Sequence, residues 1–206
     1  GSRTKLTLPD GTLVWLNDGT SITYSQGVGV ENRKIELIGE GYFEVKRNEE
    51  VPFLVKTNSL LVKVLGTKFN FRDYPDDAEA IVSLSEGKVA LNNLLKKEKE
   101  AFLLPNERVV LNKKNGRMHV EYSTVSNALQ WTNGYLFFDE ELLPDVVKEL
   151  ERSYNVKIQI ASDTLNTFRF YGNFVHREQN IQEVLEALSA TRKIHYIIEG
   201  HNITLY

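Results

Sequence analysis

The sequence predicts a mainly β protein that ends in a small α+β domain, and two patterns lead to this prediction. Between residues 4 and 122, short runs of alternating apolar residues are separated by turn residues about every 8 to 12 positions, which is typical of all-β domains. After residue 130 two runs take on the spacing of amphipathic helices, and a strand-like run follows each. With 206 residues, 41% of them apolar, the chain is long enough for one or two domains with a real core.

The composition excludes several classes of protein. A formal net charge of −3 offers no electrostatic basis for binding nucleic acid or an anionic membrane. The absence of cysteine excludes disulfides, thiolate metal sites and cysteine nucleophiles. No apolar run is long enough to cross a bilayer. Residues 1–3 resemble the remnant of a purification tag, so missing targeting signals say nothing about the compartment.

The central stretch of the β region is Ile38–Val45, with the sequence I-G-E-G-Y-F-E-V. Its period of two places Phe43 on a buried face and Tyr42 on a wet one. The glycines at 39 and 41 predict a bulge or a close backbone approach just before this strand begins. Because similar strands precede and follow it, we expect this strand to lie inside its sheet.

The other predicted strands are separated by turns of suitable chemistry. Pro9-Asp10-Gly11 and Asn17-Asp18-Gly19 are typical turn sequences, since proline fixes φ and glycine accepts a positive φ. The strands are expected at residues 5–8, 12–16, 22–24, 33–37, 53–55, 62–64, 69–71, 81–84, 89–91, 102–104, 109–111 and 120–122. They are compatible with a sandwich, a barrel or a solenoid. The charged piece Lys96–Lys99 is interpreted as a solvated hairpin tip.

The C-terminal region contains an internal repeat with an offset of 38 residues, which relates Gly134 to Gly172 and Leu143 to Ile181. Each copy reads as strand, helix, strand, so two copies predict one α+β domain with two helices on a sheet. Pro144 suits the first turn of one helix. Asn180 and Glu183 resemble a capping box for the other.

No enzyme, cofactor or metal site is predicted. The four histidines lack ligand spacing, and no nucleophile elbow or phosphate loop occurs. The acidic loop with Asp73, Asp76, Asp77 and Glu79 has the oxygen ligands that calcium prefers, but it lacks the EF-hand spacing, so a solvated turn is favoured.

Six blocks occur in a fixed order along the β region. The blocks are Leu8–Thr12; Val14, Leu16, Asn17, Ser21 and Tyr24; Arg33 and Leu37 with Gly39–Val45; Pro52, Phe53 and Val55; Val64–Thr67 with Phe69 and Asn70; and Glu86, Gly87 and Val89. This order closely resembles the FecR family of bacterial anti-sigma factors, with Gly41 where the family has alanine. From Trp131 onward, with Gly134, Phe137 and Phe138, the chain resembles the C-terminal domain of Bacteroidetes members. That domain is similar to the short STN signalling modules of secretins and TonB-dependent receptors.

The resemblance implies a domain division and a function. The expected parts are a remnant at 1–3, a FecR domain at 4–122, a linker at 123–130 and an STN-like domain at 131–206. It implies the periplasmic region of a single-pass inner-membrane regulator. This region would bind the N-terminal signalling domain of a TonB-dependent receptor. An absent cytoplasmic segment would control an extracytoplasmic-function sigma factor. The receptor's ligand, a glycan or a siderophore, stays open.

The motif residues are expected to have structural roles, with Arg33 paired to a buried carboxylate such as Glu40. They are Asp10, Gly11, Arg33, Gly39, Glu40, Phe43, Pro52, Phe53, Gly66, Thr67, Phe69 and Gly87. The partner surface is predicted on an exposed edge strand formed by Asn202, Ile203, Thr204, Leu205 and Tyr206, to which the receptor would add a strand. Replacing Ile203 with proline would then abolish binding and leave the fold intact.

Two other functions remain open at this stage. A carbohydrate-binding β domain would use Trp15, Tyr24 or Trp131 as a stacking platform. A purely structural envelope protein would assemble through its exposed edges. The ordered motif blocks favour the signalling function over both.

Overall fold

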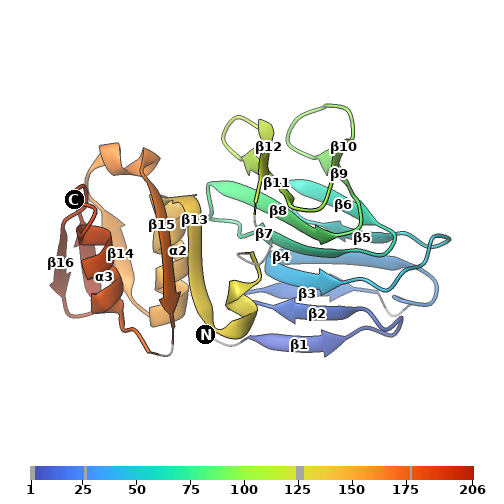
Figure 1. Ribbon diagram of the computed structural model, residues 1–206, viewed down its shortest axis with the longest axis horizontal. Coiled ribbons are helices and arrows are strands. Elements are labelled where there is room, and N and C mark those ends of the chain that lie inside the picture. The colour runs from blue at the N-terminus through green and yellow to red at the C-terminus, as the bar shows by residue number, and fades with distance from the viewer. Residues whose placement is uncertain (1–2, 26, 124–127, 177) are drawn as a thin grey trace. The chain divides into compact units, whose positions relative to one another are not determined.

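The computed structural model describes residues 3–25, 27–123, 128–176 and 178–206, and the chain forms two compact units (Figure 1). One unit ends at Thr132 and the other runs from Asn133 to Tyr206. The tag remnant predicted at Gly1 and Ser2, and residues 124–127 of the predicted linker, lie outside the described residues. Each unit is described by itself.

Strands form almost all of the regular structure of the N-terminal unit. Their bounds are β1 (Thr4–Thr7), β2 (Leu13–Leu16), β3 (Ser21–Tyr24), β4 (Arg33–Glu44), β5 (Phe53–Lys56), β6 (Leu60–Val64), β7 (Lys68–Asp73), β8 (Glu79–Glu86), β9 (Val89–Asn93), β10 (Ala101–Leu103), β11 (Glu107–Asn112) and β12 (Met118–Tyr122). The order is β10-β9-β6-β5-β4-β7-β8-β11-β12, with β2 and β3 also paired to β4 and β1 paired to β2.

The long strand β4 belongs to two sheets. Its first half pairs with β3 and β5, and from Gly39 onward it pairs with β2 and β7. The separate strands predicted at 33–37 and after Gly41 are therefore one continuous strand. The close approach predicted at the glycines is confirmed, because Gly39 has a φ of +112° and a Cβ there would lie 2.4 Å from Thr20 Oγ1. Gly39 thus lets the strand turn from one sheet into the other without ending.

Both sheets contribute to one hydrophobic core, so the unit is a β-sandwich. Phe43 stacks on Phe69 with ring centroids 5.0 Å apart and meets the edge of Phe53 at 6.2 Å, and all three are fully buried. The prediction that Tyr42 faces solvent is wrong. Its side chain is buried because the Trp15 ring packs 5.2 Å away, and burial next to Glu44 raises the pKa of Tyr42.

We expect Gly39→Ala to destabilise the N-terminal unit by about 1–3 kcal/mol, because a non-glycine residue is strained at a positive φ and its Cβ would press on Thr20. Urea unfolding followed by tryptophan fluorescence measures the change. Gly116→Ala, in the same unit at a φ of +71° with no atom closer than 3.3 Å to the added Cβ, separates backbone strain from the steric contact. Equal stability of Gly39→Ala and the parent chain would contradict the assigned bend.

In its described residues, the C-terminal unit contains two helices, one short 3-10 turn and two small sheets, and another 3-10 turn, η1 (Gln130–Asn133), lies across the boundary between the units. The bounds within the unit are β13 (Tyr135–Leu142), α2 (Leu143–Tyr154), β14 (Lys157–Ile160), η2 (Asp163–Thr167), β15 (Arg169–Val175), α3 (Ile181–Ser189), β16 (Tyr196–Glu199) and β17 (Asn202–Leu205). Strands β13 and β15 pair with each other, and the other sheet has the order β14-β17-β16.

Both helices begin as the sequence predicts. Pro144 lies in the first turn of α2, which ends at Asn155 in the left-handed conformation. The side chain of Asn180 accepts a hydrogen bond from the backbone N–H of Glu183 at 3.0 Å. The apolar faces of both helices share one core with strand residues such as Phe138 and Ile203. The predicted pair of strand-helix-strand units therefore forms a common core, with β17 added after the second unit. The prediction of a single sheet is wrong, because the first strands of the two units pair with each other and β17 joins the last two strands into a separate sheet.

Candidate functional site

One group of motif residues in the N-terminal unit lies around the buried side chain of Arg33, which is 2% exposed. Its guanidinium donates to the carbonyl oxygens of Val51 and Lys46 at 2.6 Å, and to those of Asn48 and Leu65 at 3.1 Å. Its carboxylate partner is Asp10, with Nη1 and Oδ2 3.3 Å apart. The predicted pairing with Glu40 is wrong, because the turn at 9–11 brings Asp10 to this end of β4.

Glycines allow the loops around Arg33 to pack closely. A Cβ on Gly66 would lie 2.6 Å from the Cα of Arg47, and one on Gly87 would lie 2.9 Å from the carbonyl oxygen of Gly66. Thr67 joins the same loops by donating to the carbonyl oxygen of Lys88 at 3.3 Å. Asp10 fixes its own turn by accepting a hydrogen bond from the backbone N–H of Thr12 at 3.0 Å. These contacts hold together the loops that follow β4, β6 and β8, and Asp10 fixes the turn that follows β1.

Glu40 occupies a different buried polar cluster. Its carboxylate accepts from the amides of Asn17 and Asn70, both at 2.9 Å, and lies 4.0 Å from Arg72. The indole N–H of Trp131 donates to the side-chain oxygen of Asn70 at 2.9 Å. Trp131 is 7% exposed, so its ring offers no platform for a sugar.

The acidic loop is not a solvated turn, contrary to the prediction. Asp73 forms an ion pair with Lys113, and Asp77 pairs with Arg72 at 3.1 Å. Asp73, Asp77 and Glu79 are buried, whereas Asp76 is exposed. The cations come from β7 and from the residue after β11, a placement that the local sequence does not show. In the described part of the chain, no group of three or more acidic or histidine side chains is arranged to hold a metal ion.

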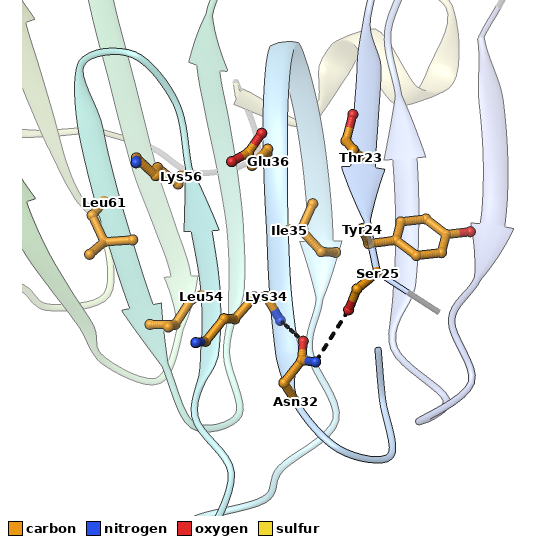
Figure 2. Close-up of a pocket in the computed structure, with 10 residues that line it drawn as sticks. All are labelled: Thr23, Tyr24, Ser25, Asn32, Lys34, Ile35, Glu36, Leu54, Lys56 and Leu61. Atoms are coloured by element: carbon orange, nitrogen blue, oxygen red, sulfur yellow. Dashed lines mark hydrogen bonds between the residues drawn. The ribbon is translucent and has the colours of Figure 1, made fainter. Parts of the chain in front are cut away.

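A groove of about 590 Å³ crosses the outer face of the sheet that contains β3–β6 (Figure 2). The charged side chains of Lys34, Glu36 and Lys56 line it, and Leu54 and Leu61 add apolar surface. The ring of Tyr24 points away from these residues (Figure 2). Trp15 lies under the ammonium of Lys5, 4.7 Å from its ring centroid. The aromatic residues nominated for sugar binding therefore do not form a platform here.

A second groove, of about 610 Å³, is where motif residues reach the surface. Pro52, Gly66, Thr67 and Gly87 line it together with Phe102, which is 51% exposed. Phe102 gave no motif signal, because it lies outside the ordered blocks. The ammonium of Lys88 lies 4.5 Å from the centroid of its ring.

In the C-terminal unit, the predicted edge strand is in fact the central strand. β17 pairs in parallel with β14 on one side and antiparallel with β16 on the other. Beyond its end, Tyr206 exchanges backbone hydrogen bonds with His195 at 2.8 and 3.0 Å. Residues Asn202–Tyr206 therefore have no open edge for an added strand, and Ile203 is buried. The prediction that Ile203→Pro would leave the fold intact is wrong as well.

The two outer strands of this sheet differ in how their free edges are protected. On β14, the outward backbone N–H of Ile158 donates to the carboxylate of Glu151 at 3.2 Å, so α2 covers that edge. Next to β16, His195 and Tyr206 form a hydrogen-bonded pair, and in an antiparallel ladder every second residue pair is hydrogen-bonded. The backbone N–H and C=O groups of Tyr196 and Ile198 therefore point away from β17. In the residues that the structure describes, β16 pairs with β17 alone.

The β16 edge is also apolar. Ile197 is 48% exposed and Ile198 is 40% exposed, on opposite faces of the strand. It carries neither proline nor lysine, the residues that natural proteins use to block edge pairing. Gly200 lies at the turn between β16 and β17 with a φ of +66°, and it is the sequence feature that could have indicated this hairpin. The candidate interface is therefore the open edge of β16, Tyr196–Glu199.

Comparisons with known proteins cover both units. The FecR protein family model matches residues 1–90, and the FecR C-terminal model matches residues 135–205. A crystal structure at 1.65 Å of a Parabacteroides distasonis protein, assigned as an anti-sigma factor, is 34% identical with a TM-score of 0.91. The alignment covers 100% of this chain and 95% of that one. A second structure, at 2.50 Å and also from P. distasonis, is 34% identical with a TM-score of 0.90, and the coverage is 100% and 94%.

No curated protein matches the chain. Within the described ranges, neither α2 nor α3 nor any other helix is long and apolar enough to cross a membrane.

Proposed function

This chain belongs to the FecR family of regulators, and from that premise we propose that it is the periplasmic, signal-receiving part of an anti-sigma factor. Its partner is the N-terminal signalling domain of a TonB-dependent outer-membrane transducer. Binding of that domain is relayed through an inner-membrane anchor to a cytoplasmic segment outside this sequence, which controls an extracytoplasmic-function sigma factor. The role is regulatory rather than catalytic.

The open β16 edge carries this proposal. An added strand gains main-chain hydrogen bonds to Tyr196 and Ile198, and contacts with the exposed side chains of Ile197 and Ile198 give it selectivity. The adjacent strand β17 is held on both sides, so the receiving sheet is already ordered before binding. The partner need only order its own strand.

The architecture of the C-terminal unit supports the finer assignment to the Bacteroidetes type with an STN-like module. Two strand-helix-strand units, β13-α2-β14 and β15-α3-β16, build one core. By the resemblance described above, this unit is similar to the STN signalling modules of TonB-dependent receptors. Two such modules that pair by their edges form one continuous sheet, which is a direct way to couple receptor and regulator.

We expect the chain to bind the N-terminal signalling domain of the TonB-dependent receptor encoded beside it with a Kd of micromolar or tighter, about −8 kcal/mol. Isothermal titration calorimetry measures it. A signalling domain from an unrelated transducer serves as the control for selectivity. Absence of heat and of any mobility shift at high concentrations of the adjacent receptor's domain would overturn the proposed function.

A further inference from the structure

Strand β12 is a second unprotected edge, at the end of the strand order of the N-terminal unit (Figure 1). In the described residues it pairs with β11 alone, over five residue pairs without a bulge. Ser123 N–H donates to the carbonyl oxygen of Asn106, and Asn112 N–H donates to that of Arg117. Because bonded pairs alternate in an antiparallel ladder, the N–H and C=O groups of Met118, Val120 and Tyr122 point away from β11.

The two faces of β12 differ in chemistry. Met118, Val120 and Tyr122 share the face directed at the core, yet Val120 is 50% exposed and Tyr122 is 92% exposed. On the other face, Glu121 accepts hydrogen bonds from Arg108 at 2.8 Å and from His119 at 2.6 Å. Burial opposes ionisation of Glu121, but these two bonds outweigh it and lower its pKa. Glu121 is therefore an anion beside a histidine at neutral pH.

This sequence is complementary to itself in the antiparallel direction. If two copies pair about a twofold axis at Val120, that residue lies opposite the partner's Val120. Met118 then lies opposite the partner's Tyr122, and His119 lies opposite the partner's Glu121. The apolar side chains cover one another on one face, and the imidazole of His119 meets the carboxylate of the partner's Glu121 on the other. The outward N–H and C=O groups coincide with the bonded positions of the new ladder.

Other edges of this unit are less suitable for such pairing. β10 has only three residues and β3 only four, and β1, also of four residues, carries Lys5 two positions after the positively charged Arg3. β12 has five residues and contains neither lysine nor proline. Natural proteins place such residues on exposed edges to prevent pairing.

We propose that two copies of this chain associate through β12, in antiparallel register centred on Val120, to extend one sheet across a symmetric dimer. A single strand pair covers a small area, so the dimer is weak and transient. Attachment of two copies to one membrane surface would raise their effective concentration. Strand β12 belongs to the N-terminal unit and β16 to the C-terminal unit, so this proposal does not rest on receptor binding at β16.

Single-cysteine variants of the whole chain test the register, because the native sequence contains no cysteine. Val120→Cys is expected to form a disulfide-linked dimer under mild oxidation. Cα atoms of a bonded antiparallel pair are about 5.5 Å apart, within the range of about 4.4–6.8 Å that a disulfide spans. Met118→Cys alone and Tyr122→Cys alone should not crosslink, since each lies about 14 Å from its own copy, four residues along the strand. A mixture of those two variants should crosslink.

Lys97→Cys, an exposed loop position, is the control for random collision. Val120→Pro provides an independent test by sedimentation velocity. It should abolish self-association and keep the fold, because the Val120 N–H takes no part in the β11 ladder. The proposal is overturned if Val120→Cys crosslinks no faster than Lys97→Cys. It is also overturned if Met118→Cys alone crosslinks as fast as Val120→Cys.

Discussion

Replacing Arg33 with methionine is expected to destabilise the N-terminal unit by about 3–5 kcal/mol, the cost of removing one partner of a buried charge pair. The substitution leaves Asp10 without its counter-ion and removes the donor for four backbone carbonyls, those of Lys46, Asn48, Val51 and Leu65. Methionine fills similar volume but cannot hydrogen-bond these oxygens. The Phe53 ring also loses the guanidinium that lies 5.5 Å from its centroid.

Urea unfolding followed by tryptophan fluorescence isolates this effect, because the two tryptophans of the chain, Trp15 and Trp131, both belong to the N-terminal unit. Arg33→Lys is expected to be nearly as damaging, since an ammonium has three donors and cannot reproduce the planar fork. The matched control is Arg47→Met, whose side chain is 69% exposed and pairs with Glu49. It should change stability by less than about 1 kcal/mol. A loss of that size or smaller for Arg33→Met would contradict the assigned role.

Local chemistry made the strands and turns predictable, whereas long-range partners were not. The alternation around Phe43 and the glycines at 39 and 41 correctly indicated a buried strand with a close backbone approach. The same residues did not reveal that β4 continues through Gly39, because a bend between two sheets depends on which strands pair with each half. Arg33 was predicted to need a carboxylate, but sequence alone could not choose between Asp10 and Glu40.

The candidate interface of the C-terminal unit also depends on long-range strand pairing, which the sequence does not show. Amphipathic spacing and the 38-residue repeat correctly predicted both helices and the flanking strands. The final strand was placed at an edge because it ends the chain. Its parallel pairing with β14 joins Lys157, in the last strand of the first unit, to Asn202, which follows the second unit, and no local pattern encodes that contact. Which strand has an open edge therefore follows only from the strand order.

Ile198→Pro is expected to weaken receptor binding at least tenfold while the C-terminal unit stays folded. The backbone N–H of Ile198 points away from β17, so proline removes no bond of the existing sheet. It removes the donor that an added strand would use, and its ring obstructs the approaching backbone. Calorimetry against the receptor's signalling domain measures the affinity, and circular dichroism checks the fold.

The matched controls separate backbone pairing from side-chain contact. Ile198→Ala keeps the N–H and removes most of the same side chain, so its affinity should stay well above that of Ile198→Pro. Ile197→Pro should disrupt the sheet itself, because the Ile197 N–H is directed at β17. Ile203→Pro should unfold the unit, since Ile203 is buried in the central strand between Ile158 and Ile198. If Ile198→Pro and Ile198→Ala bind the receptor domain equally, strand addition at β16 is wrong even where the complex itself forms.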